Sequence, residues 1–98
     1  MIVAVARIRF RLPANHSLKG KRKVMKSMLS QVRNRYNVAC SETAFHDVWQ
    51  SAEIGICTVG NSEPVLSSAM EKVLHFVEDT CPCEVVDSEL EIIHMGRN

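Results

Sequence analysis

The sequence predicts one α+β domain, residues 1–98, whose strands and helices follow one another in the order βαββαβ. The main observation is that alternation of period two, typical of a strand, gives way twice to the 3.6-residue spacing of a helix. The length suits one domain with a continuous core. A hydrophobic fraction of 46% with 23% charged residues is also ordinary for a folded globular protein.

The first half of the chain predicts a strand, a helix and a short second strand. Residues 2–12 alternate between an apolar face and a second face that carries Val3, Val5, Arg7, Arg9 and Arg11. Pro13 ends this strand, and Ser17 can cap a helix that runs to about Arg35. The apolar arc of that helix contains Leu18, Met25, Met28, Leu29 and Val32. Residues 37–43 predict a short strand with Val38 and Cys40 directed inward.

The second half predicts a longer strand, a second helix and a final strand. Residues 44–48 are expected to form a loop, and residues 49–60 a strand with Ala52, Ile54 and Ile56 directed inward. Asn61 to Pro64 are typical of a helix start, and the helix should run to about Asp79. Pro82 ends this segment, and residues 84–95 alternate again.

This element order predicts a ferredoxin-like sandwich, in which a four-stranded antiparallel sheet of order 4-1-3-2 carries both helices on one face. The first strand then lies between the third and the fourth. Its arginines, Arg7, Arg9 and Arg11, are expected beside Asp87, Glu89 and Glu91 and near Glu53. We favour cross-strand ion pairs for these arginines over contact with nucleic acid. The open face also lacks the exposed aromatic residues of RNA-reading sheets, because Val3, Val5, Cys57 and Val59 occupy it.

Charge is distributed unevenly along the chain, although the formal net charge is only +1. Ten of the twelve Lys and Arg residues lie between Arg7 and Arg35, and all eleven Asp and Glu residues lie from Glu42 onward. A basic stripe on the first helix has no acidic residue within that helix to neutralise it; it consists of Lys19, Arg22, Lys23, Lys26 and Arg33. The stripe can be a solvated face, or it can bind the phosphates of a nucleic acid.

Three stretches of sequence together resemble the YlxP-like family of small bacterial proteins, which is catalogued as a domain of unknown function. They are Ser17-Leu18-Lys19 with Lys21-Arg22, Arg33-Asn34-Arg35-Tyr36-Asn37-Val38, and His46-Asp47-Val48-Trp49-Gln50. The resemblance covers nearly the whole chain and implies a ferredoxin-like fold. Members are often encoded near initiation factor two and ribosome-binding factor A, which implies a role near the ribosome. Gly20 departs from the family, where an acidic residue is common.

The segment His46-Asp47-Val48-Trp49-Gln50 is a second candidate site, an interaction loop that uses His46, Asp47, Trp49 and Gln50. A lone Trp at a strand start favours a packing anchor over a stacking platform. His46 beside Asp47 suggests acid–base chemistry, but no nucleophile with a spaced partner accompanies the pair. The four glycines are scattered and form no phosphate loop. We therefore expect a nonenzymatic protein without a cofactor.

The four cysteines show neither CxxC spacing nor the density of a secreted disulfide scaffold, so we expect reduced thiols. Cys40 and Cys57 fall in apolar runs, which predicts burial. Cys81-Pro82-Cys83, with His75 and His94, is an alternative soft-metal site, but one intervening residue is poor for zinc. No metal is expected.

The longest apolar stretch, Met1 to Ala6, is too short to cross a bilayer, and the positive charge follows it rather than precedes it as in a signal peptide. We therefore expect a cytosolic protein with no membrane partner. Apolar residues should also gather at one end of the open sheet face, namely Val3, Val5, Cys57, Val59 and Ile93. Such a patch predicts a homo-oligomer interface. The expected partners are thus RNA or the ribosome, and a second copy of the chain.

Overall fold

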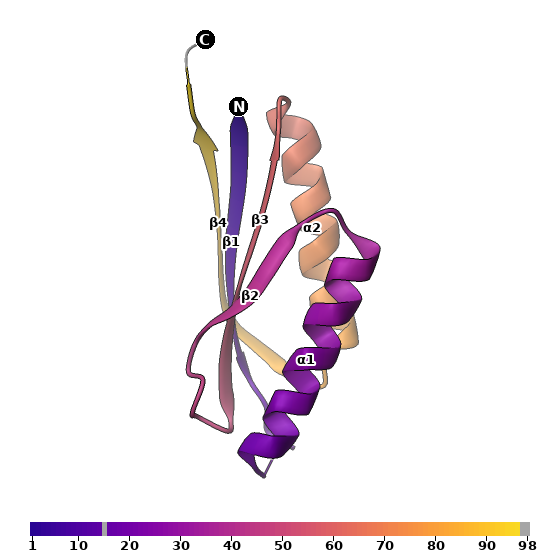
Figure 1. Cartoon of the computed structure of the whole chain (residues 1–98), viewed down its shortest axis with the longest axis vertical. Coiled ribbons are helices and arrows are strands. Elements are labelled where there is room, and N and C mark those ends of the chain that lie inside the picture. Colours follow the sequence, from indigo (N-terminus) through magenta and orange to yellow (C-terminus); the bar gives the residue numbers. More distant parts are fainter. Residues whose placement is uncertain (15, 97–98) are drawn as a thin grey trace.

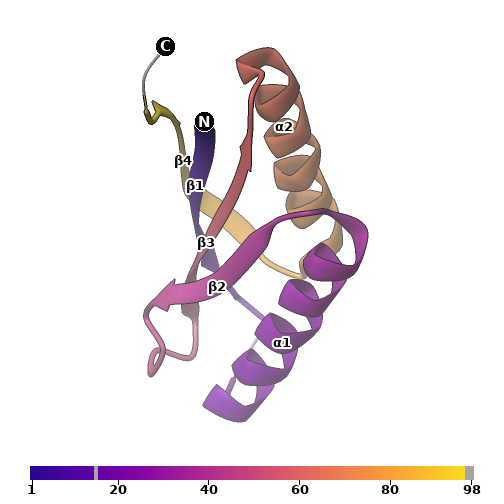
Figure 2. The same cartoon turned by 45° about the horizontal axis from the view of Figure 1, so that its top comes forward.

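The computed structural model describes residues 1–14 and 16–96, which form one sheet and two helices. The elements in chain order are β1 (Ile2–Arg11), α1 (Leu18–Arg35), β2 (Ala39–Ala44), β3 (Ser51–Gly60), α2 (Glu63–Thr80) and β4 (Glu84–His94). All neighbouring strands pair antiparallel, in the order β2-β3-β1-β4. Both helices lie on the same side of the sheet (Figure 1), and a view turned by 45° agrees (Figure 2). The predicted ferredoxin-like fold is confirmed.

The hydrophobic core lies between the sheet and the two helices. The alternate residues Ala4, Ala6, Ile8 and Phe10 of β1 and Ala52, Ile54 and Ile56 of β3 are buried there. α1 contributes Met25, Met28, Leu29 and Val32, and α2 contributes Leu66, Met70, Val73 and Val77. The remaining residues of β1 lie on the open face of the sheet, as period two requires.

Both predicted helix starts are observed. The Ser17 hydroxyl accepts a hydrogen bond from the Gly20 amide at 3.0 Å and so caps α1, as predicted. α2 follows Ser62 and has Glu63 and Pro64 in its first turn, but the Ser62 side chain makes no capping hydrogen bond. Neither helix of the described chain carries a stretch of apolar sequence of the length that a membrane crossing requires.

Two strands begin later than the sequence predicts. β2 begins at Ala39 because the chain turns before it, where the Val38 amide donates to the Tyr36 carbonyl at 3.0 Å. β3 begins at Ser51 rather than at Trp49 because a turn precedes it, closed by the bond from the Val48 amide to the Phe45 carbonyl at 3.0 Å. Trp49 therefore belongs to the connection between β2 and β3.

The expectation of reduced thiols is wrong for two of the four cysteines. Cys81 and Cys83 form a disulfide across Pro82, where the chain passes from α2 to β4 and brings the two Cα atoms to 5.2 Å. The two sulfur atoms of the alternative soft-metal site are therefore bonded to each other and are not free thiolates. Cys40 is buried as predicted, and burial raises the pKa of its thiol. Cys57 is a free cysteine of intermediate exposure on the open sheet face.

Candidate nucleic-acid interface

The arginines of β1 are bound to acidic side chains on the open sheet face. Arg7 lies 3.4 Å from Glu53, 3.3 Å from Asp87 and 3.7 Å from Glu89, and Arg9 lies 3.4 Å from Glu53. Glu53 is only 8% exposed. A hydrogen bond from Thr43 at 2.8 Å, followed by those from Arg7 and Arg9, holds the pKa of Glu53 below its ordinary value. The predicted ion pairing of this face is thus confirmed, and these cations are already compensated.

One predicted partner of these arginines is wrong. Glu91 stands opposite Val5, whereas Arg11 pairs with Glu84 at 3.0 Å. This position of Glu91 belongs to the same regular register that pairs Arg7 with Glu89 and Arg9 with Asp87. An irregularity between Arg9 and Phe10 then brings Glu84 rather than Val85 opposite Arg11.

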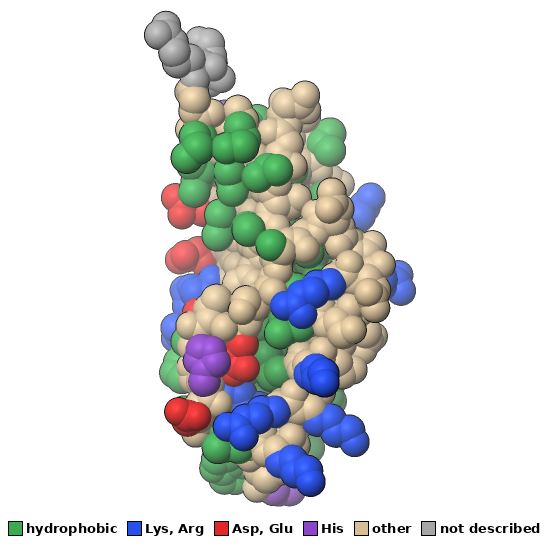
Figure 3. All heavy atoms as spheres, viewed as in Figure 1, with side chains coloured by type: hydrophobic (Ala, Val, Ile, Leu, Met, Phe, Trp, Pro, Cys, Tyr) green, Lys and Arg blue, Asp and Glu red, His purple; other side chains and the backbone are tan. Residues whose placement is uncertain are grey.

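The basic stripe of α1 divides into free and engaged cations. Lys19, Lys23 and Lys26 are exposed and have no acidic partner within residues 1–14 and 16–96, and Arg22 approaches only Asp47, at 4.0 Å. Arg33 instead donates a hydrogen bond to the Cys40 carbonyl at 2.6 Å, so it joins α1 to β2. Lys and Arg side chains are visible along the length of α1 in Figure 3. We call Lys19, Arg22, Lys23 and Lys26 the basic face.

Lys21 is the most buried charged residue of the described chain, and its burial was not predicted. Its side chain forms an ion pair with Glu42 at 3.0 Å and donates to the carbonyls of Val48, at 2.8 Å, and Phe45. Lys21 is 0% exposed. A signal was present in the sequence, since Lys21 precedes Met25 and Met28 by four and seven residues and so lies within the apolar arc. A lysine in that arc predicts a buried partner.

The interaction loop, residues 45–50, lies beside the first turns of α1. Asp47 approaches Arg22, and the Trp49 ring lies 6.4 Å from the His16 ring at an angle of 45°. His46 contacts the Glu42 carbonyl at 3.2 Å, and the Gln50 carbonyl accepts a hydrogen bond from the Leu12 amide at 2.8 Å. The loop and the basic face thus form neighbouring parts of one surface.

Trp49 lies at the surface of the connection between β2 and β3. Its side chain is 40% exposed, and in the described part of the chain it belongs neither to the core nor to the side chains packed against the core. Phe45 is also exposed, and the Arg9 guanidinium lies 5.2 Å from the centre of its ring. Aromatic side chains therefore come from the loop, where the strand pattern gave no indication of them.

The predicted apolar patch is present on the open sheet face. Val3 pairs with Val59 on one side and Ile93 on the other, and Val5 pairs with Cys57. Val59 is 60% exposed. A shallow hollow of about 270 Å³ adjoins the patch at Gly55, where a side chain would meet Thr43. Figure 3 shows hydrophobic side chains gathered at this end of the sheet.

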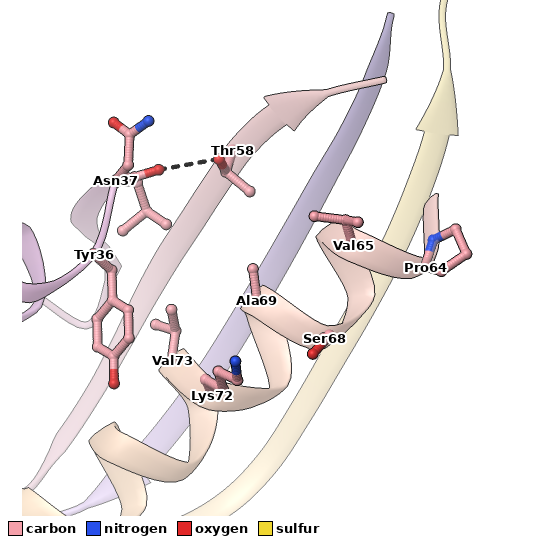
Figure 4. A pocket seen from close by; sticks show the side chains of 10 residues that line it. Tyr36, Asn37, Thr58, Pro64, Val65, Ser68, Ala69, Lys72 and Val73 are labelled. Carbon is pink, nitrogen blue, oxygen red and sulfur yellow. Dashed lines mark hydrogen bonds between the residues drawn. The ribbon is translucent and has the colours of Figure 1, made fainter. Parts of the chain in front are cut away.

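A larger hollow, about 530 Å³, lies between α2 and the connection from α1 to β2 (Figure 4). Val65, Ala69 and Val73 of α2 line it together with Tyr36 and Lys72. The Thr58 hydroxyl donates to the Asn37 carbonyl at its rim, at 3.1 Å. Thr58 is near the end of β3 and the interaction loop precedes its start, so this hollow and the loop lie at opposite ends of β3. Within the described ranges, no three His, Cys, Asp or Glu side chains are grouped as a metal ion requires.

Comparison with known proteins identifies relatives of this chain. A family model described as "Protein of unknown function (DUF503)" matches residues 3–90. The "Uncharacterized protein YlxP" of Bacillus subtilis (strain 168) is 39% identical over 62 residues, which are 63% of this chain and 67% of that protein. Two designed proteins of known structure also match most of the chain at low identity. Foldit4 has 16% identity and a TM-score of 0.47 over 99% of this chain and 98% of its own. Ferredog-Diesel has 14% identity and a TM-score of 0.43 over 94% and 84%.

Proposed function

We propose that this chain, which belongs to the DUF503 family of proteins of unknown function, is a nonenzymatic cytosolic protein that associates with RNA or the ribosome through the basic face of α1. One contrast carries the proposal. The cations of β1 are held by carboxylates, whereas Lys19, Lys23 and Lys26 are exposed without an acidic partner in the described chain. Several free cations on one rigid helix face suit a polyanion with regularly spaced phosphates.

Salt dependence tests this proposal. Phosphate contacts release counterions, so the affinity for RNA should fall steeply as salt rises and should depend little on sequence. Changing Lys19, Lys23 and Lys26 together to Glu should abolish RNA binding and co-sedimentation with ribosomal particles at low salt. The free energy of unfolding should change by about 0.5 kcal/mol or less per exposed site.

The matched control is Lys72→Glu, because Lys72 is also an exposed lysine on a helix but lies on α2. This variant should bind RNA almost as well as the parent. The proposal fails if the parent binds no RNA at low salt, or if the triple variant binds as tightly as the parent.

The apolar patch supports a second candidate function, a homo-oligomeric scaffold without nucleic-acid binding. Val5, Val59 and Ile93 are exposed together on three paired strands, and an uncovered apolar cluster on a small domain is typical of a contact surface. Sedimentation equilibrium should then detect a dimer or larger species. Val5→Glu should weaken it, and Val65→Glu, on the helix side of the molecule, should not. A parent that stays monomeric at high concentration excludes this candidate.

A further inference from the structure

The connection between β2 and β3 exposes three large apolar side chains, those of Phe45, Val48 and Trp49. Burial in the core would account for such residues, but Trp49 is 40% exposed and is not one of the buried core residues of the described chain. An exposed Trp beside cations is typical of a surface that binds a partner.

Lys21 restrains the conformation of the interaction loop. Its ammonium group donates hydrogen bonds to the carbonyls of Phe45 and Val48 and forms an ion pair with the Glu42 carboxylate. The same turn is closed by the Val48 amide, which donates to the Phe45 carbonyl at 3.0 Å. Phe45 has a positive φ of 61°, a conformation that is uncommon for a large side chain. A loop tied at these points loses little conformational entropy when it binds.

The same attachment places the Trp49 ring at the beginning of the basic face. Lys21 belongs to α1, so its bonds to the loop fix the loop relative to that helix. The neighbour of Trp49 is His16, which directly precedes the cap of α1, and Lys19 lies in the first turn of α1. Asp47 lies 4.0 Å from Arg22 one turn further along. An exposed aromatic ring and free cations therefore share one end of the molecule.

We propose that this surface, given RNA binding by the basic face, accepts an unpaired nucleotide. The base stacks on the Trp49 ring, and the flanking phosphates lie on Lys19 and Arg22. An aromatic ring on a loop reaches a base only where the base is splayed out of a helix, because the faces of paired bases are already stacked. Cations alone bind single-stranded and duplex RNA through the same phosphates. Lys21 acts as a positioning residue in this site.

Trp49 is the single tryptophan of the chain, so its fluorescence reports on the site directly. We would titrate the protein with a single-stranded oligouridine of about 12 nucleotides and with a duplex RNA of the same length. The single strand should quench the fluorescence and bind more tightly than the duplex. The variants at position 49 lack this tryptophan, so their affinities are measured by the fluorescence anisotropy of a dye-labelled RNA. Trp49→Ala should weaken single-strand binding about tenfold and leave duplex binding unchanged. Trp49→Phe, which keeps a ring, should retain most of the affinity, as should the control Val65→Ala.

Lys21→Met tests the positioning role. It removes the charge without touching Lys19, Arg22 or Trp49, and it should weaken single-strand binding about as much as Trp49→Ala does. The double variant Lys21→Met/Trp49→Ala should lose no more than either single variant, since both changes disable the same stacking contact. Circular dichroism at the assay temperature establishes whether each variant is folded. If Lys21→Met is unfolded, the comparison of Trp49→Ala with Trp49→Phe determines whether a base stacks on the ring at position 49.

The outcomes separate this inference from the proposal on which it depends. If the parent binds neither RNA at low salt, RNA association itself is refuted. If the parent binds both RNAs equally, without fluorescence change and without loss in Trp49→Ala, the basic face still binds phosphate but the stacking site is refuted. Quenching by the single strand alone, together with weaker single-strand binding by Trp49→Ala and by folded Lys21→Met but not by Trp49→Phe, supports the inference.

Discussion

Replacement of Lys21 by methionine is the sharpest test of how the fold supports its candidate site. Methionine keeps an unbranched side chain of similar length, so the packing inside the apolar arc of α1 changes little. The ammonium group is lost, and with it the ion pair to Glu42 at 3.0 Å and the hydrogen bonds to the carbonyls of Phe45 and Val48. The substitution thus removes the attachment of the loop rather than a part of the core.

The expected loss of stability in Lys21→Met depends on how deeply Glu42 and the two loop carbonyls are buried once the ammonium group is gone. Removal of one partner of a buried ion pair costs about 3–5 kcal/mol, because the other charge is left uncompensated. The Glu42 side chain is 18% exposed, so water can reach it in part, and the loop carbonyls can turn toward solvent. We therefore expect the lower end, a loss of about 3 kcal/mol in the free energy of unfolding. For a domain of this size that lowers Tm by about 15 °C.

Urea unfolding of Lys21→Met, Glu42→Gln and the double variant would measure this effect. In the double variant no uncompensated charge remains, so part of the loss, about 1–2 kcal/mol, should be recovered. Lys23→Met is the matched control, since Lys23 is exposed on the same helix, and it should change stability by about 0.5 kcal/mol or less. A loss below about 1 kcal/mol in Lys21→Met, or no recovery in the double variant, would refute the reasoning.

Three further predictions concern stability and cysteine chemistry. Arg33→Ala should lower the free energy of unfolding by about 1.5 kcal/mol in urea, because it leaves the Cys40 carbonyl without its donor, whereas Lys26→Ala should have little effect. The pKa of Glu53 is lowered in the fold, so its contribution is complete above about pH 4.3 and is lost as pH falls through the folded-state pKa. Glu53→Gln should therefore be less stable than the parent at neutral pH. The difference between their free energies of unfolding, measured in urea at a series of pH values, should become smaller as pH falls. A difference that does not change with pH would contradict the ion pairing of Glu53. Alkylation of the unfolded, unreduced protein should label the free cysteines alone, Cys40 and Cys57, and labelling of all four would contradict the disulfide.

The sheet was predictable because period two is a local property of each strand. Alternation in residues 2–12 already assigns Ile8 to the core and Arg9 to the open face, and both assignments are confirmed. Register between strands is not local, which is why Glu91 was assigned to the wrong neighbour. The irregularity after Arg9 is a separate departure, which gives Arg11 the partner Glu84, and no residue type in β1 indicates it.

The candidate site was only partly predictable for a related reason. The basic face follows from helical spacing, so Lys19, Lys23 and Lys26 were identified from the sequence. The loop depends on a contact between residues far apart in the chain, Lys21 with Glu42 and Val48, and no spacing within either segment encodes it. Arg33 was grouped with the exposed cations because periodicity gives its side of the helix but not its bond to β2.

The apolar patch and the surface formed by the basic face and the interaction loop are far enough apart for both to be occupied at once. Val3 lies near the start of β1 beside Val59, whereas the interaction loop adjoins its end, where Arg11 pairs with Ser51. Eight residues of strand separate these points by roughly 26 Å, in a molecule 49 Å long. A dimer joined through the apolar patch would therefore leave both basic faces open and would present two phosphate-binding surfaces to one RNA, which raises avidity without a new contact. It follows that Val5→Glu should reduce the apparent affinity for a long RNA through loss of the dimer, while the affinity for one short oligonucleotide stays unchanged.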